Sequence, residues 1–549
     1  MGIKRYIADS DTTITNAFKS NLTTRGTGSN MGRADSLEVF SIYGQETSGS
    51  SELSRILVQF PVTDITTDRA SGTIPASGSV RFYLRMFNAV TPFTVPRNFT
   101  LNISAVSGAA KNNTDGVLTP VGVSWQEGSG IDMDEYTDVT RDGEGANWIN
   151  MGSSSANGVF KWGNNGSTVG GTFYTESSSS FTQTFEDGTE DLEVDITQLV
   201  EQWVNSAGNV LGTIPNYGVG VFLTSSQEAL VASSDASTVV PANTAGAARS
   251  YYTKKFFARS SEFFYKRPMI EARWDSSNKD DRGNFYYSSS LATSAENLNT
   301  LYLYNYFRGQ LRNIPSIGTG NIYVRIYSGS ADNSEPTGSE IILSADETHV
   351  ATAAPTVITG GYYATGIYTA SFALTAAATP ITTLFDVWQS GSGLVAPYAL
   401  GPVFHTGSIQ PQVLELSPQN PSTRFVTNIT NLKPVYSTDE TARFRVFTRQ
   451  KDWNPSIYTK AVSVTPPFIV ESGSFAVVRM IDDVNAVHFG TGSDLHTQMS
   501  FDVSGSYFDL DMGLLERGYS YKIKFAYYNG SIGDWQEQPE EFRFRVEGP

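Results

Sequence analysis

The stretch SVRFYLRMFNAV, residues 79–90, decides the class of fold. Apolar side chains occupy every second position from Val80 to Met86, and arginine or tyrosine fills the positions between them. Successive side chains of a β-strand point to opposite faces, so this alternation predicts a strand with one face in a core. The stretch RILVQF at 55–60 alternates in the same way. Both stretches indicate a protein built from half-buried strands.

The whole chain has the composition of a β-protein. Its 549 residues include 27 Tyr, 32 Phe and 49 Gly. Aromatic residues fit pleated sheets, and glycine fits the turns between strands. Hydrophobic residues make up 39% of the chain, which is enough for packed cores. A chain of this length predicts about two to four domains. We therefore expect an all-β, multidomain chain of β-sandwiches.

Two polar segments divide the chain. Residues 272–290 are charged and rich in serine, and residues 407–423 carry three prolines. Such composition is typical of linkers or domain edges. The expected parts are an N-terminal arm or first edge strand at 1–34, a β-sandwich at 35–275, a second at 284–410, and a third, immunoglobulin-like or similar, at 424–549.

One segment, DITQLVEQWVN at 195–205, predicts a short helix among the strands. Its apolar residues recur at helical spacing. Asp195 and Thr197 are residue types that cap the start of a helix. We expect this helix to interrupt the first sandwich.

Charge and residue usage exclude several classes of function. The net charge of −17 repels nucleic acid phosphates, so we expect no nucleic-acid partner. The chain has no cysteine, which excludes disulfides, thiolate metal sites and thiol nucleophiles. The four histidines, His349, His405, His488 and His496, lack a metal-binding spacing. No run of about 18 apolar residues is present, so we expect no membrane insertion.

The stretch SWQEGSGIDMDEYTD, residues 124–138, is a candidate metal site. Asp132, Asp134 and Asp138 supply the carboxylate oxygens that calcium prefers, although the spacing lacks the complete EF-hand pattern. The alternatives are a solvated loop and a pair of catalytic carboxylates such as a glycosidase requires. We favour the solvated loop. Calcium at these three aspartates is the one cofactor that the sequence suggests.

No segment carries the motif of an enzyme active site. The glycine-rich stretches GEGANWINMG at 143–152 and GNNGSTVGG at 163–171 lack the Gly-Lys-Ser/Thr ending of a phosphate-binding loop. A nucleophile elbow of the G-x-S-x-G type is also absent from the sequence. We therefore expect a protein that is not an enzyme.

A series of short motifs runs in order through the first 275 residues. The motif residues are Asp11, Thr12, Asn30, Gly32, Arg55, Leu57, Phe60, Trp125, Glu127, Gly128, Trp148, Trp162, Asp195, Thr197, Leu199, Val200, Trp203, Arg259, Glu262 and Pro268. In this order they resemble the DNRLRE-type domain, a β-sandwich similar to family-six carbohydrate-binding modules. The resemblance implies a jelly-roll-like fold with one short helix. It says little about function, because β-sandwiches host many functions.

Three tryptophans of these motifs, Trp125, Trp148 and Trp162, are candidate glycan-binding or interface residues. Aromatic rings in exposed loops hold sugar rings by stacking on their faces. The alternative is that the three rings anchor loops and pack a core, and we favour it.

These observations lead to one expectation about function. Domains of the DNRLRE type occur in surface proteins, in accessory modules of enzymes and in virion proteins. The C-terminal half is similar in style to accessory virion proteins of tailed, T4-like marine phages. We expect a structural virion protein of the tail, neck or head, assembled in the host cytoplasm, with other virion proteins and copies of itself as partners. The alternative is a carbohydrate-binding adhesin that recognises host-surface glycan through the Trp125–Trp162 loops.

Overall fold

The structure is a computed structural model, and it confirms the all-β fold class. Strands dominate both halves of the chain, and two α-helices occur among the residues that the structure describes. The described residues are 2–19, 21–43, 51–91, 95–112, 118–121, 123–131, 145–154, 158–163, 168–205, 214–232, 239–329, 336, 338–341, 356–375, 381–392, 399–413, 424–453, 457, 467–530 and 532–548.

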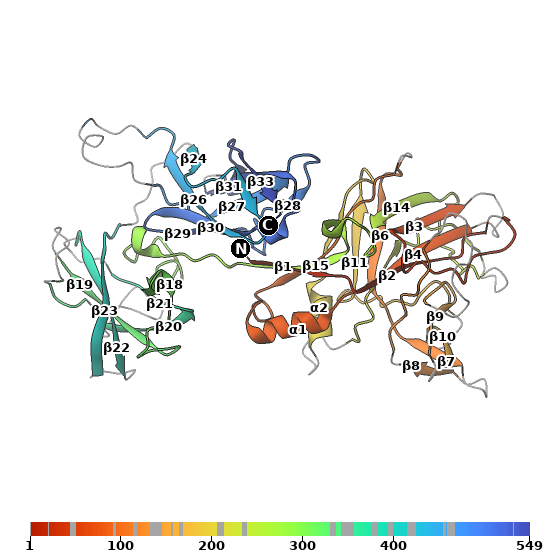
Figure 1. The fold of residues 1–549 in the computed structure, drawn as a ribbon, viewed down its shortest axis with the longest axis horizontal. Helices are drawn as coiled ribbons and strands as arrows, with labels where there is room; N and C mark the ends of the chain where they lie inside the picture. The colour runs from red at the N-terminus through yellow and green to blue at the C-terminus, as the bar shows by residue number, and fades with distance from the viewer. Residues whose placement is uncertain are drawn as a thin grey trace. The chain divides into compact units, whose positions relative to one another are not determined.

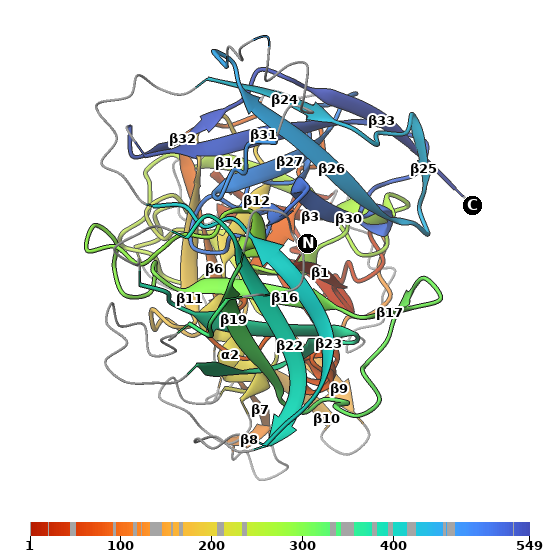
Figure 2. The same ribbon diagram turned by 90° about the vertical axis from the view of Figure 1, so that its left-hand side faces the viewer.

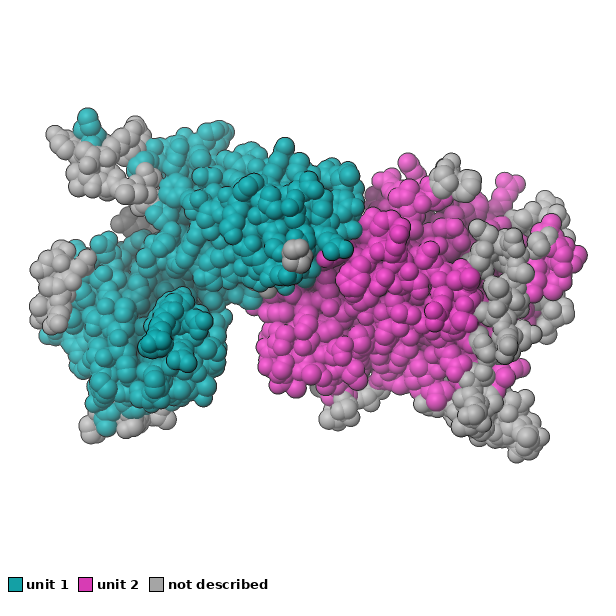
Figure 3. All heavy atoms as spheres, viewed as in Figure 1, with its two compact units in different colours: residues 1, 276–549 teal, residues 2–275 magenta. Residues whose placement is uncertain are grey.

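The chain divides into two compact units, residues 2–275 and residues 276–549, which Figure 3 distinguishes by colour. We call them the N-terminal unit and the C-terminal unit. The boundary after Asp275 coincides with the expected end of the first sandwich. The two sandwiches expected at 284–410 and 424–549 lie together in the C-terminal unit.

Among its described residues, the N-terminal unit contains three sheets. The seven-stranded sheet has the order β11 (Ser180–Phe185), β6 (Phe99–Ala105), β13 (Val219–Leu223), β4 (Ser51–Gln59), β3 (Ser36–Tyr43) and β14 (Tyr251–Phe257), and β2 (Ser10–Thr15) also pairs with β4. A four-stranded sheet has the order β1 (Gly2–Ile7), β15 (Met269–Trp274), β5 (Arg81–Met86) and β12 (Leu192–Asp195). A second four-stranded sheet has the order β8 (Leu118–Val121), β7 (Ala109–Asn112), β10 (Gly158–Trp162) and β9 (Asn150–Ser154).

One core of the N-terminal unit contains residues of both the seven-stranded sheet and the sheet of β5. Phe82, Leu84 and Met86 of β5 are fully buried in it, which confirms the strand predicted from their alternation. Ile56 and Val58 of β4 belong to the same core. Residues 2–34, expected as an arm or an edge strand, include β1 at the edge of one sheet and β2 paired with β4.

Helix α2 (Thr197–Val204) forms where the sequence predicts it. Asp195 Oδ1 accepts hydrogen bonds from the backbone N–H of Thr197 at 2.9 Å and from its hydroxyl at 2.5 Å. The helix lies beside α1 (Val62–Ser71) in Figure 1, and Arg69 of α1 pairs with Glu201 of α2 at 2.6 Å.

Helix α1 follows directly after the strand predicted from the alternation at 55–60, and the sequence analysis does not predict it. The strand β4 ends at Gln59, and α1 begins at Val62. Val62 and Ile65 are the helix's buried residues, so its sequence carries little helical periodicity. Gly72, with a left-handed φ of 77°, ends the helix.

The first predicted sandwich of the C-terminal unit, which keeps that name below, has one six-stranded sheet and a core of its own among its described residues. The strand order is β16 (Asn299–Tyr304), β21 (Ile367–Phe372), β20 (Val357–Ala364), β19 (Ile322–Ser328), β22 (Leu384–Ser392) and β23 (Ala399–Ile409), with a small hairpin of β17 (Tyr306–Phe307) and β18 (Gln310–Leu311). Trp388, Tyr368 and Ile326 are fully buried in this core.

The second sandwich of this unit has two sheets. One has the order β24 (Phe425–Ile429), β26 (Thr441–Gln450), β30 (Gly505–Asp511) and β29 (Ser500–Asp502). The other has the order β25 (Val435–Ser437), β33 (Phe542–Glu547), β31 (Ser520–Asn529), β27 (Gly473–Arg479) and β28 (Asn485–Val487), and β32 (Asp534–Glu537) pairs with β31. Aromatic rings join the sheets, because Phe508 of the first stacks on Phe475 of the second at 4.0 Å. Within the first sheet, Phe508 also stacks on Phe444 at 5.1 Å.

The connector at 278–287 pairs with both sandwiches of the C-terminal unit. Asp280 N–H donates to the Phe501 carbonyl at 3.1 Å, beside β29 of the second sandwich. Further along, the Gln412 N–H donates to the Phe285 carbonyl at 2.8 Å, and the Gln412 carbonyl accepts from the Tyr287 N–H at 2.9 Å. These backbone bonds tie the two sandwiches through one segment. Three short 3-10 helices also lie in the described chain: η2 (Phe264–Lys266), η3 (Asp281–Gly283) and η4 (Met512–Leu514).

Candidate functional sites

Motif residues from distant segments meet in one cluster of the N-terminal unit. We call Asp11, Asn30, Glu127 and Arg259 the motif cluster. Arg259 Nη2 donates to both carboxylate oxygens of Glu127, at 2.8 Å each. The backbone N–H of Arg259 donates to Asp11 Oδ2 at 2.5 Å, and the backbone N–H of Asp11 donates to Glu127 Oε1 at 3.1 Å. The cluster therefore joins residues 116 and 248 positions apart in the sequence.

Asn30 holds the loop that carries Glu127. Its Nδ2 donates to the carbonyl oxygens of Glu127 and Ala146, at 2.7 Å each, and its Oδ1 accepts from Gly130 N–H at 3.2 Å. Gly128 has a φ of 79°, and a Cβ at this position would lie 2.2 Å from Asn30 Oδ1. Glycine is therefore required where the loop passes over the amide.

The motif cluster combines a buried carboxyl group, that of Asp11, with a partly exposed ion pair between Arg259 and Glu127. Asp11 is fully buried, and burial raises the pKa of its carboxyl to about 7. Its Oδ1 has no hydrogen-bond partner within the described chain. The guanidinium of Arg259 is committed to Glu127. Asp11 is therefore closed off from solvent, whereas the Arg259 guanidinium and the Glu127 carboxylate, 34% and 22% exposed, bind each other and join their two loops.

The three candidate tryptophans lie in the interior of the N-terminal unit. Trp148 and Trp162 have no exposed surface, and Trp125 is 4% exposed. They pack in a second core together with Leu57, on the face of β4 opposite the first core. Each indole N–H donates to a backbone carbonyl oxygen at 2.8 Å. Their ring faces are covered by protein, so they are not a stacking surface that a sugar can reach.

The candidate calcium ligands Asp132, Asp134 and Asp138 lie outside the described residues. Within the described part of the chain, no group of three histidine, aspartate or glutamate side chains is close enough to hold a metal ion. Across those same residues, no helix has both the length and the apolar character needed to cross a membrane.

Strand β23 is an unusual edge of the first sandwich in the C-terminal unit. It pairs with β22 and ends the sheet, as Figure 2 shows for β19, β22 and β23. Most of its eleven residues are exposed on both faces of the strand, including Val403 at 51% and Thr406. The strand contains no Asp, Glu, Lys or Arg, but it contains Pro402, which has no backbone N–H, and its pairing with β22 has two register shifts. Proteins commonly protect such edges with charges, because unpaired backbone groups there accept another strand.

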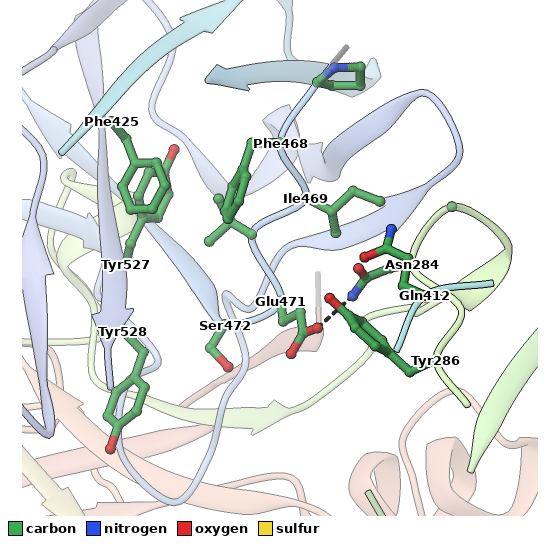
Figure 4. A pocket seen from close by; sticks show the side chains of 13 residues that line it. Asn284, Tyr286, Gln412, Phe425, Phe468, Ile469, Glu471, Ser472, Tyr527 and Tyr528 are labelled. Carbon is green, nitrogen blue, oxygen red and sulfur yellow. Dashed lines mark hydrogen bonds between the residues drawn. The ribbon is translucent and has the colours of Figure 1, made fainter. Parts of the chain in front are cut away.

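A pocket of about 450 Å³ opens in the C-terminal unit where the connector meets the second sandwich (Figure 4). Phe425, Phe468, Tyr527 and Tyr528 line its aromatic side. The rings of Phe425 and Phe468 lie 5.3 Å apart, and Phe425 meets Tyr527 edge to face at 5.5 Å. Tyr527 is buried and its hydroxyl is 2.9 Å from the Thr427 hydroxyl, so this ring forms a fixed floor.

The opposite side of the pocket is polar. Asn284, Tyr286, Gln412 and Glu471 line it, with Asn284 Nδ2 donating to Glu471 Oε1 at 2.5 Å (Figure 4). Burial, with the nearby Glu471 carboxylate, raises the pKa of the Tyr286 hydroxyl. Glu471 and Gln412 are exposed. An aromatic wall thus faces amide and carboxylate groups across an open space.

The pocket is the feature that sequence reasoning missed. Asn284 and Tyr286 come from the segment expected as a first linker, and Gln412 from the segment expected as a second. The local signal that marks them is aromatic residues inside otherwise polar connectors, as in NFYY at 284–287. The pairing of both segments with one sandwich depends on tertiary contacts that no local pattern encodes.

Comparison with known proteins adds little to this geometry. No protein-family model and no curated protein sequence matches the chain. Among solved structures, the chain aligns with the crystal structure of a DUF4785 family protein from Legionella pneumophila subsp. pneumophila str. Philadelphia 1 at 8% identity. The alignment covers 84% of this chain and 90% of the other, with a TM-score of 0.12. A likeness this weak supports no inference.

Proposed function

We propose that the chain is a structural component of a tailed-phage virion that acts by protein–protein assembly, without catalysis. We further propose that β23 is one of its assembly edges. The observation that carries the proposal is the character of β23, an eleven-residue edge strand without charge and with both faces exposed. The expected resemblance of residues 1–275 to DNRLRE-type domains is compatible with this role.

The occupant that fits β23 best is the same strand of a second copy. Two copies related by a two-fold axis pair antiparallel, so that each strand fills the open edge of the other. Backbone hydrogen bonds then run from one six-stranded sheet into the next, except at Pro402, which has no N–H to donate. Because β23 carries no charge, its self-pairing avoids the repulsion that the net charge of −17 imposes elsewhere.

The oligomeric state of variants tests the edge. Val403→Lys combined with Thr406→Lys places two positive charges on each of the paired strands, so that four like charges gather along the shared edge, which is unfavourable. We expect light scattering after size exclusion to show a dimer for the wild-type chain and a monomer for this variant. Val159→Lys is the matched control, because Val159 is 46% exposed and lies in β10, a strand paired on both sides. A monomeric wild-type chain at all concentrations contradicts pairing through β23.

The virion assignment has its own test. A gold-labelled antibody against the chain is imaged on particles from the source lysate. Label at a fixed place on the head, neck or tail supports the proposal. Clean particles, with label on cell debris or free glycan, contradict it and favour an adhesin.

The second candidate is the carbohydrate-binding adhesin. The rings expected to serve it, Trp125, Trp148 and Trp162, are buried. The observation that favours the adhesin is instead the aromatic pocket of the C-terminal unit, with exposed rings facing polar side chains. Both functions are compatible in one receptor-binding virion protein.

A further inference from the structure

Two of the aromatic rings that line the pocket are exposed to solvent. Phe468 is 39% exposed and Tyr528 is 47% exposed. Tyr528 meets Trp535 edge to face at 5.7 Å, so its ring is held in one orientation while one side stays open. Large exposed rings gathered beside a hollow are typical of a ligand site rather than of a core.

The floor and the rim of the pocket are held in place. Tyr527 is fixed by its hydroxyl contact with Thr427, and Phe468 N–H donates to the Thr448 carbonyl at 2.7 Å. Tyr528 N–H donates to the Ser472 carbonyl at 2.9 Å. Backbone bonds of this kind keep the rings in position without a ligand, which lowers the entropic cost of binding.

The polar side of the pocket offers three planar hydrogen-bonding groups, which are two side-chain amides and one carboxylate. Asn284, Gln412 and Glu471 each carry two side-chain polar atoms, and one of each in Asn284 and Glu471 is used in their mutual bond at 2.5 Å. The remaining amide and carboxylate atoms match the paired hydroxyls on adjacent carbons of a sugar ring. Aromatic rings opposite them match its apolar C–H face.

We propose that this pocket binds a neutral glycan, with a pyranose ring between the Phe468–Tyr528 side and the Asn284–Glu471 side. The proposal deepens the adhesin candidate and does not depend on assembly through β23. The Glu471 carboxylate and the net charge of −17 disfavour sialylated, sulfated or phosphorylated glycans. The polar wall equally disfavours a wholly apolar ligand, which would leave these groups without partners. The pocket volume lies in the range of roughly 300–1,000 Å³ that is usual for small-ligand sites.

The first experiment screens the full-length chain on an array of neutral and acidic glycans. We expect retention on neutral glycans and little on acidic ones. The retained glycan is then titrated by calorimetry against Phe468→Ala, Tyr528→Ala and Glu471→Ala. Each change removes a direct contact, and we expect each to weaken affinity about tenfold or more, as loss of a contact worth about 1.4 kcal/mol does.

The matched control is Tyr306→Ala, because Tyr306 is a 59% exposed tyrosine of β17 that does not line the pocket. Its affinity should equal that of the wild type. Thermal unfolding of every variant separates lost binding from lost fold.

The outcomes separate the pocket from the adhesin function. Retention of a neutral glycan with weaker binding in the pocket variants supports the proposal. Retention of a glycan with unchanged affinity in all pocket variants overturns the pocket while leaving glycan recognition in place. Absence of any retained neutral glycan, or preference for acidic ones, overturns the pocket proposal, and complete absence overturns the adhesin too.

Discussion

The motif cluster with its neighbouring tryptophans and the aromatic pocket contain the same kinds of side chain, but the two regions differ in how far the fold covers them. In the motif cluster, Asp11, Glu127 and Arg259 bond to one another, and the tryptophans nearby are covered on all sides. In the pocket, Glu471 is exposed beside the open ring of Phe468. The difference teaches that aromatic residues and carboxylates indicate a ligand site only where the fold leaves them exposed to solvent. Motif membership alone marks structure in this chain.

The largest expected effect on stability concerns the buried tryptophans of the N-terminal unit. Trp148→Ala empties a fully buried indole from the second core and removes its bond to the Val239 carbonyl. We expect the free energy of unfolding of the N-terminal unit to fall by roughly 3–5 kcal/mol. Guanidinium denaturation followed by circular dichroism measures it. A loss below about 1 kcal/mol would mean that the ring is not packed as described.

The next effect concerns the ion pair of the motif cluster. Glu127→Ala leaves the Arg259 guanidinium and the Asp11 N–H without the acceptor that both use. We expect a loss of roughly 1–3 kcal/mol by the same denaturation measurement, because the N–H of the buried Asp11 is left without an acceptor, while the Arg259 guanidinium, 34% exposed, is left in contact with water. The control is Asp187→Ala, whose 3.9 Å pair with Arg97 is exposed on both sides and should matter by less than about 0.5 kcal/mol. Equal losses in the two variants would refute a structural role for the cluster.

The pH dependence of stability sharpens the role of Asp11. Burial raises the pKa of its carboxyl to about 7 in the folded protein, against 3.8 for the free side chain. The folded state therefore holds the proton more tightly, and this stabilisation is lost as the pH rises through 7. As the pH rises from 5 to 8, we expect the free energy of unfolding of Asp11→Asn to increase relative to that of the wild type by on the order of 1–3 kcal/mol. Parallel stability curves over that interval would show that Asp11 does not titrate there.

The two regions also differ in how far the sequence predicts them. Alternation from Val80 to Met86 predicts a strand with a buried face, because a local period of two reports one-sided burial directly. The helix at Thr197–Val204 follows from helical spacing in the same way. Helix α1 escapes this reasoning, since it buries only one turn's worth of apolar side chains.

The candidate sites depend on features that the sequence does not carry. The motif residues do converge, as Asp11, Asn30 and Glu127 show, but the sequence does not reveal that Asp11 and Asn30 are buried. The pocket requires Asn284, Gln412 and other segments to meet through backbone pairing of the connector. Exposure and long-range pairing are properties of the tertiary structure, so a linear pattern carries neither.

The smallest expected effect on stability concerns the exposed ring of Phe468 in the aromatic pocket. Phe468→Ala removes a ring that is 39% exposed and touches Phe425 on one face, so we expect a loss of about 0.5–1 kcal/mol. The matched control in the same sandwich is Phe475→Ala, because Phe475 is fully buried and stacks on Phe508 at 4.0 Å. This control should cost roughly 3–5 kcal/mol in the same denaturation measurement. If both phenylalanines cost alike, Phe468 is a core residue and the exposed pocket wall is an extension of the core. If only Phe475 is costly, the fold keeps Phe468 at the surface for a reason other than stability, as a binding role requires.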